Sequence, residues 1–140
     1  MLSNAFRYTG ITPLMEEYRD SAINAFKYAS LLSDKMLDNY GFDRMKGRDI
    51  MMSAAAFLYN VTGDIKYEDI MHEETLCKSG KSVIINENRN QFWATVAYLF
   101  TDQEVHYPEL YSNMKSSIIN EALSKEVAMM RKRPSRRSNR

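Results

Sequence analysis

Two short motifs in the chain resemble parts of known chemical sites. Gly80-Lys81-Ser82 matches the end of a phosphate-binding loop, but that loop also needs a preceding strand and a glycine where this chain has Thr75. His72-Glu73 resembles the start of a zinc-protease helix, although Leu76 stands where the second histidine is required. The only other histidine, His106, is distant in sequence. Because a metal site needs at least a third ligand, we expect no metal site, no nucleotide site and no cofactor.

The 18 acidic residues do not define a catalytic pair. Hydrolysis of a glycosidic bond needs two carboxylates that face each other across a cleft. Glu16-Glu17 and Glu73-Glu74 are adjacent in the chain, so their side chains do not face each other on a helix. The residues alone therefore indicate no catalytic acid or base in this chain.

The aromatic side chains are candidates for stacking on sugar rings. Tyr98 and Phe92 lie off the main apolar stripe of their predicted helix, which leaves their rings available for a ligand. Trp93 lies on that stripe, and a ring at such a position is more often part of the core. We therefore expect Trp93 to be buried and take Tyr98 and Phe92 as the candidate sugar-binding rings.

Residues 131–140 form a basic tail on a mildly acidic body. Six of the 19 Lys and Arg residues lie there, so the remaining 13 against 18 acids give the body a net charge of −5. The tail has no apolar anchor, and we expect it to be disordered in isolation. It could attract an anionic surface by charge, but it lacks interleaved aromatic residues and a folded reader module. The sequence therefore does not predict nucleic-acid binding.

The hydrophobic pattern predicts an all-α fold of about five helices in one helical-hairpin domain, residues 1–130. The expected helices cover residues 12–40, 49–60, 64–77, 91–100 and 107–130. Pro13 and Pro108 suit the first turn of a helix, while Gly63 and Asp64 can end one helix and cap the next. Between the third and fourth helices, Val83-Ile84-Ile85 is expected to be a short strand or an anchored loop.

Three of these helices carry apolar stripes that are expected to face a core. The stripes consist of Tyr18, Ala22, Ala25, Ala29, Leu32 and Met36 in the first helix, Trp93, Val96, Ala97 and Phe100 in the fourth, and Ile119, Leu123, Val127 and Met130 in the fifth. A second stripe adjoins that of the fifth helix and contains Tyr111, Met114, Ile118 and Ala122. Two adjoining stripes predict contacts on two sides of that helix.

Residues 54–67, Ala-Ala-Ala-Phe-Leu-Tyr-Asn-Val-Thr-Gly-Asp-Ile-Lys-Tyr, are the most informative stretch of the chain. The small residues, Leu-Tyr, Thr-Gly-Asp and the final tyrosine resemble a hairpin of the six-hairpin (α/α) toroid glycosidases, above all of the family 9 glycoside hydrolases. Residues 91–99 resemble the tryptophan-alanine helix that follows, and residues 133–139 resemble the loop into the next helix. The resemblance covers most of this chain but only a middle portion of such a catalytic domain.

The resemblance implies a partial (α/α) toroid from an inverting enzyme that hydrolyses β-linked glucans or related polysaccharides. The family's paired aspartates lie in an earlier segment and its acid glutamate in a later one. No catalytic residue is therefore carried over, and the chain alone is expected to be inactive. The resemblance also implies that Arg136 and Arg137 lie near the substrate cleft, where they would contact polysaccharide.

Two alternatives use the same helices without a toroid. The chain could be a stand-alone helical interaction module whose basic tail binds an acidic partner, or a helical-repeat scaffold that binds peptides in its groove. A toroid segment should expose apolar helix faces that permit self-association, whereas an autonomous module should bury them. The chain has no signal peptide and no apolar run near the ~18 residues that span a bilayer, although the resembled family is commonly secreted. The sequence therefore assigns no compartment.

Overall fold

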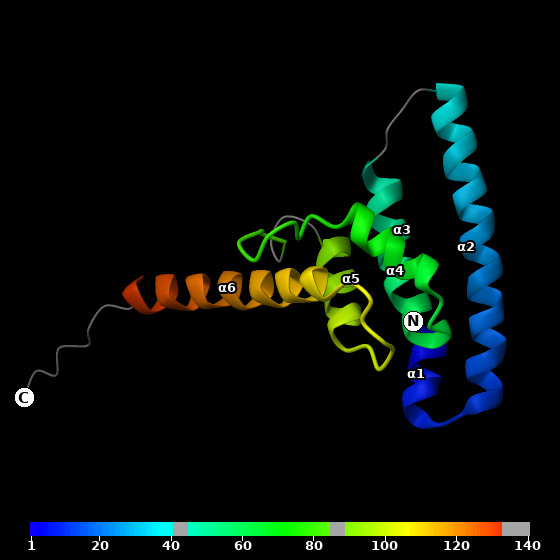
Figure 1. The fold of residues 1–140 in the computed structure, drawn as a ribbon, viewed down its shortest axis with the longest axis horizontal. Helices are drawn as coiled ribbons and strands as arrows, with labels where there is room; N and C mark the ends of the chain where they lie inside the picture. Colours follow the sequence, from blue (N-terminus) through cyan, green and yellow to red (C-terminus); the bar gives the residue numbers. More distant parts are fainter. Residues whose placement is uncertain (41–44, 85–88, 133–140) are drawn as a thin grey trace, which may run out of the picture.

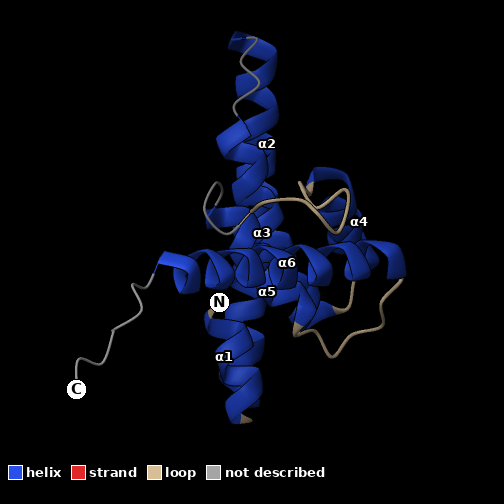
Figure 2. Ribbon diagram, turned by 90° about the vertical axis from the view of Figure 1, so that its left-hand side faces the viewer, coloured by secondary structure: helices blue, strands red, loops and turns tan. Residues whose placement is uncertain are grey.

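The computed structural model describes residues 1–40, 45–84 and 89–132 (Figure 1). The helices within these residues are α1 (Leu2–Thr9), α2 (Thr12–Tyr40), α3 (Met45–Thr62), α4 (Ile65–Glu74), α5 (Arg89–Leu99) and α6 (Pro108–Lys132). The described residues contain no strand (Figure 2), which confirms the prediction of an all-α fold built from helical hairpins.

The first helix, α1, is not predicted by the sequence pattern, because its 8 residues are too few for a clear apolar period. It ends at Gly10, whose φ of 73° lies in the left-handed region. Tertiary contacts hold this helix in place. The Ser3 hydroxyl donates to the Met15 carbonyl at 2.7 Å, and the Phe6 ring stacks on Tyr18 at 5.5 Å.

The core lies where α3, α4, α5 and α6 meet. Helix α3 packs most extensively on α5, because Ala55, Ala56 and Ala94 are completely buried and let the two backbones approach closely. Larger side chains fill the remaining space, namely Met52, Leu58, Tyr59, Tyr67, Met71, Ile84, Tyr98, Leu110 and Met114. Ile84 lies in a loop rather than a strand, and Ile85 lies outside the described residues. Of the two predicted alternatives, the described part of this segment is therefore the loop that an apolar side chain anchors.

The turn between α3 and α4 is built as the sequence predicts. Gly63 has a φ of 67° at the end of α3. At the start of α4 the Asp64 side chain accepts a hydrogen bond from the Lys66 N–H at 3.2 Å. A hydrogen bond from the Lys66 ammonium also holds the pKa of the Asp64 carboxyl below its usual value. The helical hairpin expected at this position is confirmed.

Replacing Gly63 with alanine is expected to destabilise the chain by about 2–3 kcal/mol, because it combines strain at a positive φ with a steric clash. A Cβ at Gly63 would lie 2.8 Å from Gln103 Oε1, and the Gln103 amide donates to the Asn60 carbonyl at 3.1 Å. Gly10→Ala is the matched control, since Gly10 has a similar φ of 73° and an open Cβ site. Urea unfolding should show a loss of only about 1 kcal/mol for the control. Equal losses would contradict a clash with Gln103.

The apolar stripe predicted for α5 is wrong in part, because Ala97 is buried in the core but both large aromatic members are exposed. Trp93 is 49% exposed and Phe100 is 71% exposed, whereas Gln91 and Tyr98 are completely buried. The physical reason is that the polar groups of α5 find partners inside the protein. The Gln91 amide, for example, donates to the Glu74 carbonyl at 3.0 Å. Hydrophobicity therefore does not mark the buried face of this helix.

Helix α2 is buried along only part of its length. Ile23 and Phe26 pack against the core, and the Phe26 ring meets Tyr67 edge-on at a centroid distance of 5.5 Å. Leu32 and Met36, which the predicted stripe places in the core, are exposed. Figure 1 shows the reason, because α2 continues beyond the core and diverges from α3 toward its C-terminal end.

Helix α6 also contacts the body mainly through its first half. Met114 is buried in the core, whereas Ile119 and Leu123 are exposed, contrary to the first predicted stripe. In Figure 1 the helix extends away from the other helices, and its second half contacts the loop at residues 80–84 through Asn120 and Glu121. It ends at Lys132, so the helix enters the region predicted as a tail, and residues 133–140 lie outside the described part.

Candidate functional site

Four elements bring polar side chains together around one buried carboxylate. Glu68 on α4 is completely buried, and it is joined by Tyr59 from α3, Tyr98 from α5 and His106 from the segment before α6. We call these four residues the Glu68 cluster. A carboxylate, an imidazole and two phenols can hold or transfer protons, so the cluster is the candidate chemical site of the chain.

The Glu68 carboxylate is surrounded by hydrogen-bond donors. The Tyr98 hydroxyl donates to Oε1, and the His106 backbone N–H donates to the same oxygen at 3.0 Å. Nδ1 of the His106 ring lies 2.7 Å from Oε2. A buried carboxylate needs such donors to offset its lost hydration, and here the donors tie the segment before α6 to α4.

Both tyrosines of the Glu68 cluster keep their protons. Burial raises the pKa of Tyr59 to about 12, and the negative charge of Glu68 adds to the effect. Burial also raises the pKa of Tyr98, with a further contribution from its hydrogen bond to Glu68. Both phenols therefore serve as hydrogen-bond donors, Tyr98 to the Glu68 carboxylate and Tyr59 to the Glu104 carbonyl.

A cleft of about 400 Å³ adjoins the Glu68 cluster and is lined by both histidines of the chain. The His106 side chain is 34% exposed, whereas the His72 ring stacks on Tyr107 at a centroid distance of 4.3 Å. The Tyr107 hydroxyl donates to Asp69 at 2.6 Å, and this hydrogen bond raises the pKa of Tyr107. Lys78 adds a cation to the lining. The cleft thus joins an aromatic wall to groups that can exchange protons.

The phosphate and zinc motifs do not form sites in the described part of the chain. No group of three His, Cys, Asp or Glu side chains lies close enough there to hold a metal ion. Gly80-Lys81-Ser82 follows helix α4 rather than a strand. Its Gly80 carbonyl accepts a hydrogen bond from Asn120 on α6 at 2.8 Å, so this segment docks the loop on α6.

An apolar groove of about 560 Å³ runs between α1, α2 and α3. Its walls combine larger apolar side chains, such as Phe26, Phe57 and Leu58, with small ones, which include Ala22, Ala25, Ala29, Ser33, Ser53 and Ala54. Within the described residues, no Asp, Glu, Lys or Arg side chain lines it. Small side chains let another helix approach closely, so this lining suits an apolar helix.

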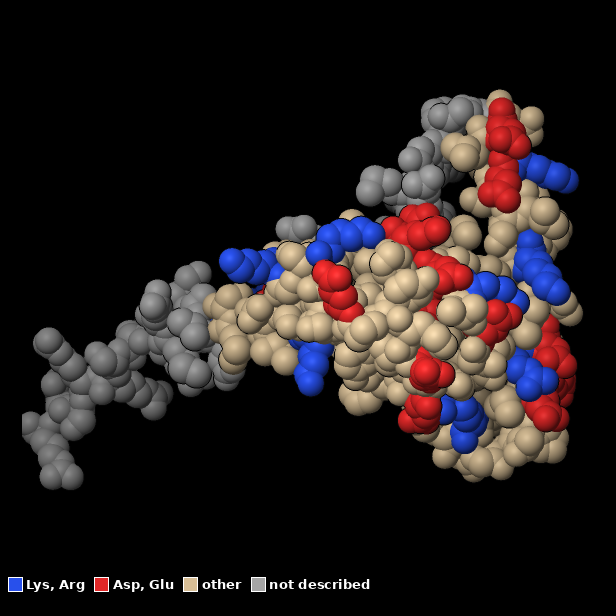
Figure 3. All heavy atoms as spheres, viewed as in Figure 1, with Lys and Arg blue, Asp and Glu red and all other residues tan. Residues whose placement is uncertain are grey.

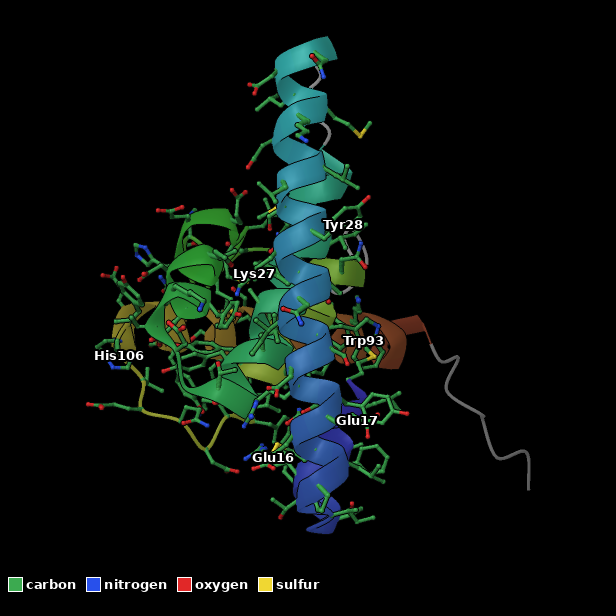
Figure 4. The ribbon with its side chains drawn as sticks, turned by 90° about the vertical axis from the view of Figure 1, so that its right-hand side faces the viewer. Glu16, Glu17, Lys27, Tyr28, Trp93 and His106 are labelled. Carbon is green, nitrogen blue, oxygen red and sulfur yellow. The ribbon has the colours of Figure 1, made fainter. Side chains whose placement is uncertain are left out.

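Large apolar side chains are exposed beside this groove. Tyr28 is 66% exposed, and Leu31 and Ile50 are also largely in solvent. Figure 4 shows Tyr28 and Trp93 on the same side of α2, opposite Lys27. Although α2 and α6 are long, no helix in the described part is apolar enough to cross a membrane. Exposed apolar surface of this kind is typical of an interaction face.

Charged side chains are interspersed on the face of the molecule shown in Figure 3. Acidic and basic residues alternate along α2, and Arg7 pairs with Asp102. This face therefore carries no basic patch of the kind that attracts nucleic acid.

Two of the four residues predicted to contact sugar, Tyr98 and Phe92, lie in the described part of the chain, both on α5. Tyr98 is completely buried in the Glu68 cluster, so its ring cannot stack on a sugar at the surface. Phe92 is partly buried and packs at 5.2 Å against Trp93, which is exposed instead of buried. Arg136 and Arg137 lie outside the described residues.

Sequence reasoning did not identify Glu68 or His106. An acidic residue on a helix is normally exposed, and nothing in the local sequence names its partners, which come from three other elements. The signal that could have identified Glu68 is its position along the helix. Glu68 lies three residues before Met71 and next to Tyr67, so it shares the buried face of α4 with two apolar side chains.

Comparison with known proteins finds no matching family model, no similar curated protein and no similar solved structure. Within the described residues, the fold is all-helical and built of packed hairpins, with a buried polar cluster at Glu68 and an open apolar groove beside α2.

Proposed function

We propose that this chain is a helical-hairpin scaffold of a glycoside hydrolase that acts on β-linked glucans or related polysaccharides. The chain supplies no catalytic residue for the cleavage of glycosidic bonds, and further hairpins complete the toroid. Two features support the proposal. Residues 54–67 resemble the family 9 hairpin, and in the structure they form the turn between two helices, with Gly63 at the end of α3 and Asp64 as the cap of α4.

The observation that carries this proposal is the uncovered apolar side of α2. A self-contained domain covers most of its apolar helix faces, whereas a hairpin of a toroid keeps a face for each neighbour. In the described chain, the groove between α2 and α3 is open, and Tyr28, Leu31 and Leu32 are exposed along α2. These features match a scaffold element that packs against another helix.

The same faces predict self-association when the chain is alone. The groove has walls with several small side chains and no charged ones in the described part, and α2 itself offers exposed leucines that could occupy the groove of a second copy. Association that buries apolar surface stabilises the folded state by mass action. We therefore expect the thermal stability of the purified chain to increase with its concentration.

The test is thermal unfolding, followed by far-UV circular dichroism over an about 100-fold range of chain concentration. The Tm of the natural chain should rise with concentration. Ala29→Lys places a charge in the groove and should remove the rise. Asn24→Lys is the matched control, because Asn24 is exposed on α2 and does not line the groove. A sharp, concentration-independent transition of the natural chain would contradict the proposal.

The proposed contact with polysaccharide is tested by adding soluble β-glucan to the same thermal unfolding experiments. A rise in Tm at fixed chain concentration would support a direct contact with polysaccharide, and an unchanged Tm would restrict the chain to a scaffold role. The placement of Arg136 and Arg137 at the substrate cleft stays a prediction of the resemblance.

The second candidate is a stand-alone helical interaction module, with the basic tail on an acidic partner or a peptide in the groove. The open groove is the observation that favours it, since it exists in the folded chain without further hairpins. The two candidates predict different results in the thermal unfolding experiments described above. The module predicts one sharp transition at every concentration, because its fold needs no second chain.

A further inference from the structure

The hydrogen bonds of the Glu68 cluster determine which nitrogen of His106 carries the proton. Tyr59 Oη lies 3.1 Å from His106 Nδ1, but the Tyr59 hydrogen is donated to the Glu104 carbonyl, so toward His106 this oxygen can only accept. Glu68 Oε2, at 2.7 Å from Nδ1, also accepts. Because both neighbours of Nδ1 are acceptors, Nδ1 holds a hydrogen, and Nε2 of the neutral ring carries the lone pair.

His106 lines the cleft beside the Glu68 cluster. The Nδ1 edge of its ring is turned to the buried carboxylate, which leaves Nε2 on the opposite edge, and the side chain is 34% exposed. The nearest carboxylate on that side, Glu104 Oε2, is 3.8 Å from Nε2 and belongs to a solvent-exposed side chain. Figure 4 shows His106 at the margin of the molecule, away from α2. A small molecule in the cleft can therefore reach Nε2.

We propose that this cleft is a general-base site for the hydrolysis of small acyl esters, with His106 as the catalytic residue and Glu68 as its positioning residue. Nε2 takes a proton from a water molecule, and the water oxygen forms a bond to the acyl carbon. The bond from that carbon to the alcohol oxygen then breaks, and the departing oxygen takes the proton back from Nε2. The products are a carboxylic acid and an alcohol, and no other reactant is consumed.

The charges around the cleft suit this chemistry. The Glu68 and Glu104 carboxylates stabilise the imidazolium that forms when Nε2 accepts a proton. Two N–H groups of the Lys78 ammonium donate to the His72 and Glu73 carbonyls, each at 3.1 Å. These bonds anchor Lys78 in the cleft and leave a third N–H for the negative oxygen that develops on the acyl carbon.

The remaining groups of the cleft define its size and polarity. The stacked rings of His72 and Tyr107 provide a flat wall, and Pro108 and Leu110 add apolar surface. Glu109 is a further carboxylate in the lining, so an uncharged ester fits the cleft better than an anionic one. The volume of about 400 Å³ suits a small ester.

The test measures turnover of p-nitrophenyl acetate by the full chain well beyond the number of amino groups in its nine lysines and its amino terminus, which separates catalysis from simple acetylation. His106→Gln should lower the steady-state kcat/KM by about 10-fold or more, since a positioned general base contributes on that scale. Lys115→Gln is the control, because Lys115 is exposed on α6 and does not line the cleft, and its rate should stay within about 2-fold. Equal rates for the two variants, or a natural chain no faster than free imidazole, would overturn the proposal.

A second measurement covers the possibility that His106→Gln does not fold. Nitrogen-15 NMR of the natural chain should show that, in the neutral ring, Nδ1 carries the hydrogen and Nε2 carries the lone pair. The reverse pattern overturns the proposal. Glu68→Gln should also make both tautomers of His106 coexist in the same spectra, because an amide can donate as well as accept, and kcat should fall while KM stays unchanged. A lower kcat with the tautomer ratio of the natural chain would contradict the assignment of Glu68 as a positioning residue.

Discussion

Replacing Glu68 with leucine is expected to lower the free energy of unfolding by about 3–5 kcal/mol, although leucine is apolar and similar in volume. The Tyr98 hydroxyl, the His106 N–H and the His106 Nδ1–H would all lose their acceptor. Each donor left buried without a partner costs about 1–3 kcal/mol. Urea unfolding, followed by circular dichroism, measures the loss.

Glu73→Leu is the matched control for this substitution. Glu73 lies on the same helix α4 but is exposed, so its replacement should change the free energy of unfolding by less than about 0.5 kcal/mol. Glu68→Gln should fall between the two, because the amide keeps one acceptor oxygen and turns a donor toward the remaining donors. A loss below about 1 kcal/mol for Glu68→Leu would show that water reaches the cluster and satisfies its donors.

Replacing Tyr67 with alanine is the second large effect that we expect, a loss of about 3–5 kcal/mol. Tyr67 is almost completely buried on α4, and its ring receives the edge of Phe26 from α2. The substitution therefore removes core volume and also the contact that attaches α2 to the α3–α4 hairpin. Urea unfolding measures the loss, and hydrogen exchange should show faster opening of α2 than of α5.

Tyr67→Phe separates the ring from its hydroxyl. It keeps the edge-on contact with Phe26, so it should cost no more than about 1 kcal/mol. If Tyr67→Ala and Tyr67→Phe were equally destabilising, the hydroxyl rather than the packing of the ring would hold α2 in place. A normal exchange rate for α2 in Tyr67→Ala would mean that Ala22 and Ile23 suffice as its anchor.

The scaffold proposal and the ester-hydrolysis proposal concern separate surfaces of the chain. The first depends on the groove beside α2, and the second depends on the cleft at His106, which Figure 4 places away from α2. Ala29→Lys tests only the groove, and His106→Gln tests only the cleft. Either proposal can therefore fail without affecting the other.

Local signals in the sequence predicted the helices well where a turn or a cap marks the boundary. The α3–α4 hairpin follows from Gly63 and Asp64, because a positive φ and an N-cap are properties of single residues. The beginnings of α2 and α6 likewise follow from Pro13 and Pro108. The sequence pattern did not predict helix α1, because contacts with residues far along the chain stabilise its few turns.

The buried faces were predicted less well, because hydrophobicity was taken as the mark of burial. In α5 the structure buries Gln91 and Tyr98 and exposes Trp93 and Phe100. A polar side chain can be buried when a partner satisfies it, and that partner is invisible in a local pattern. The candidate site Tyr98 was misplaced for the same reason, since its hydroxyl serves Glu68 on another helix.

By itself, the sequence determined that this protein is all-helical and where most of its helices begin and end, because helix period, glycine turns and caps act over a few residues. Only the tertiary structure decided which side chains are buried and that Glu68, Tyr59, Tyr98 and His106 meet. These residues come from different elements, and their hydrogen bonds span 30 to 47 positions in sequence. A carboxylate is buried only where such distant donors converge, and that convergence is a property of the packed helices rather than of any local segment.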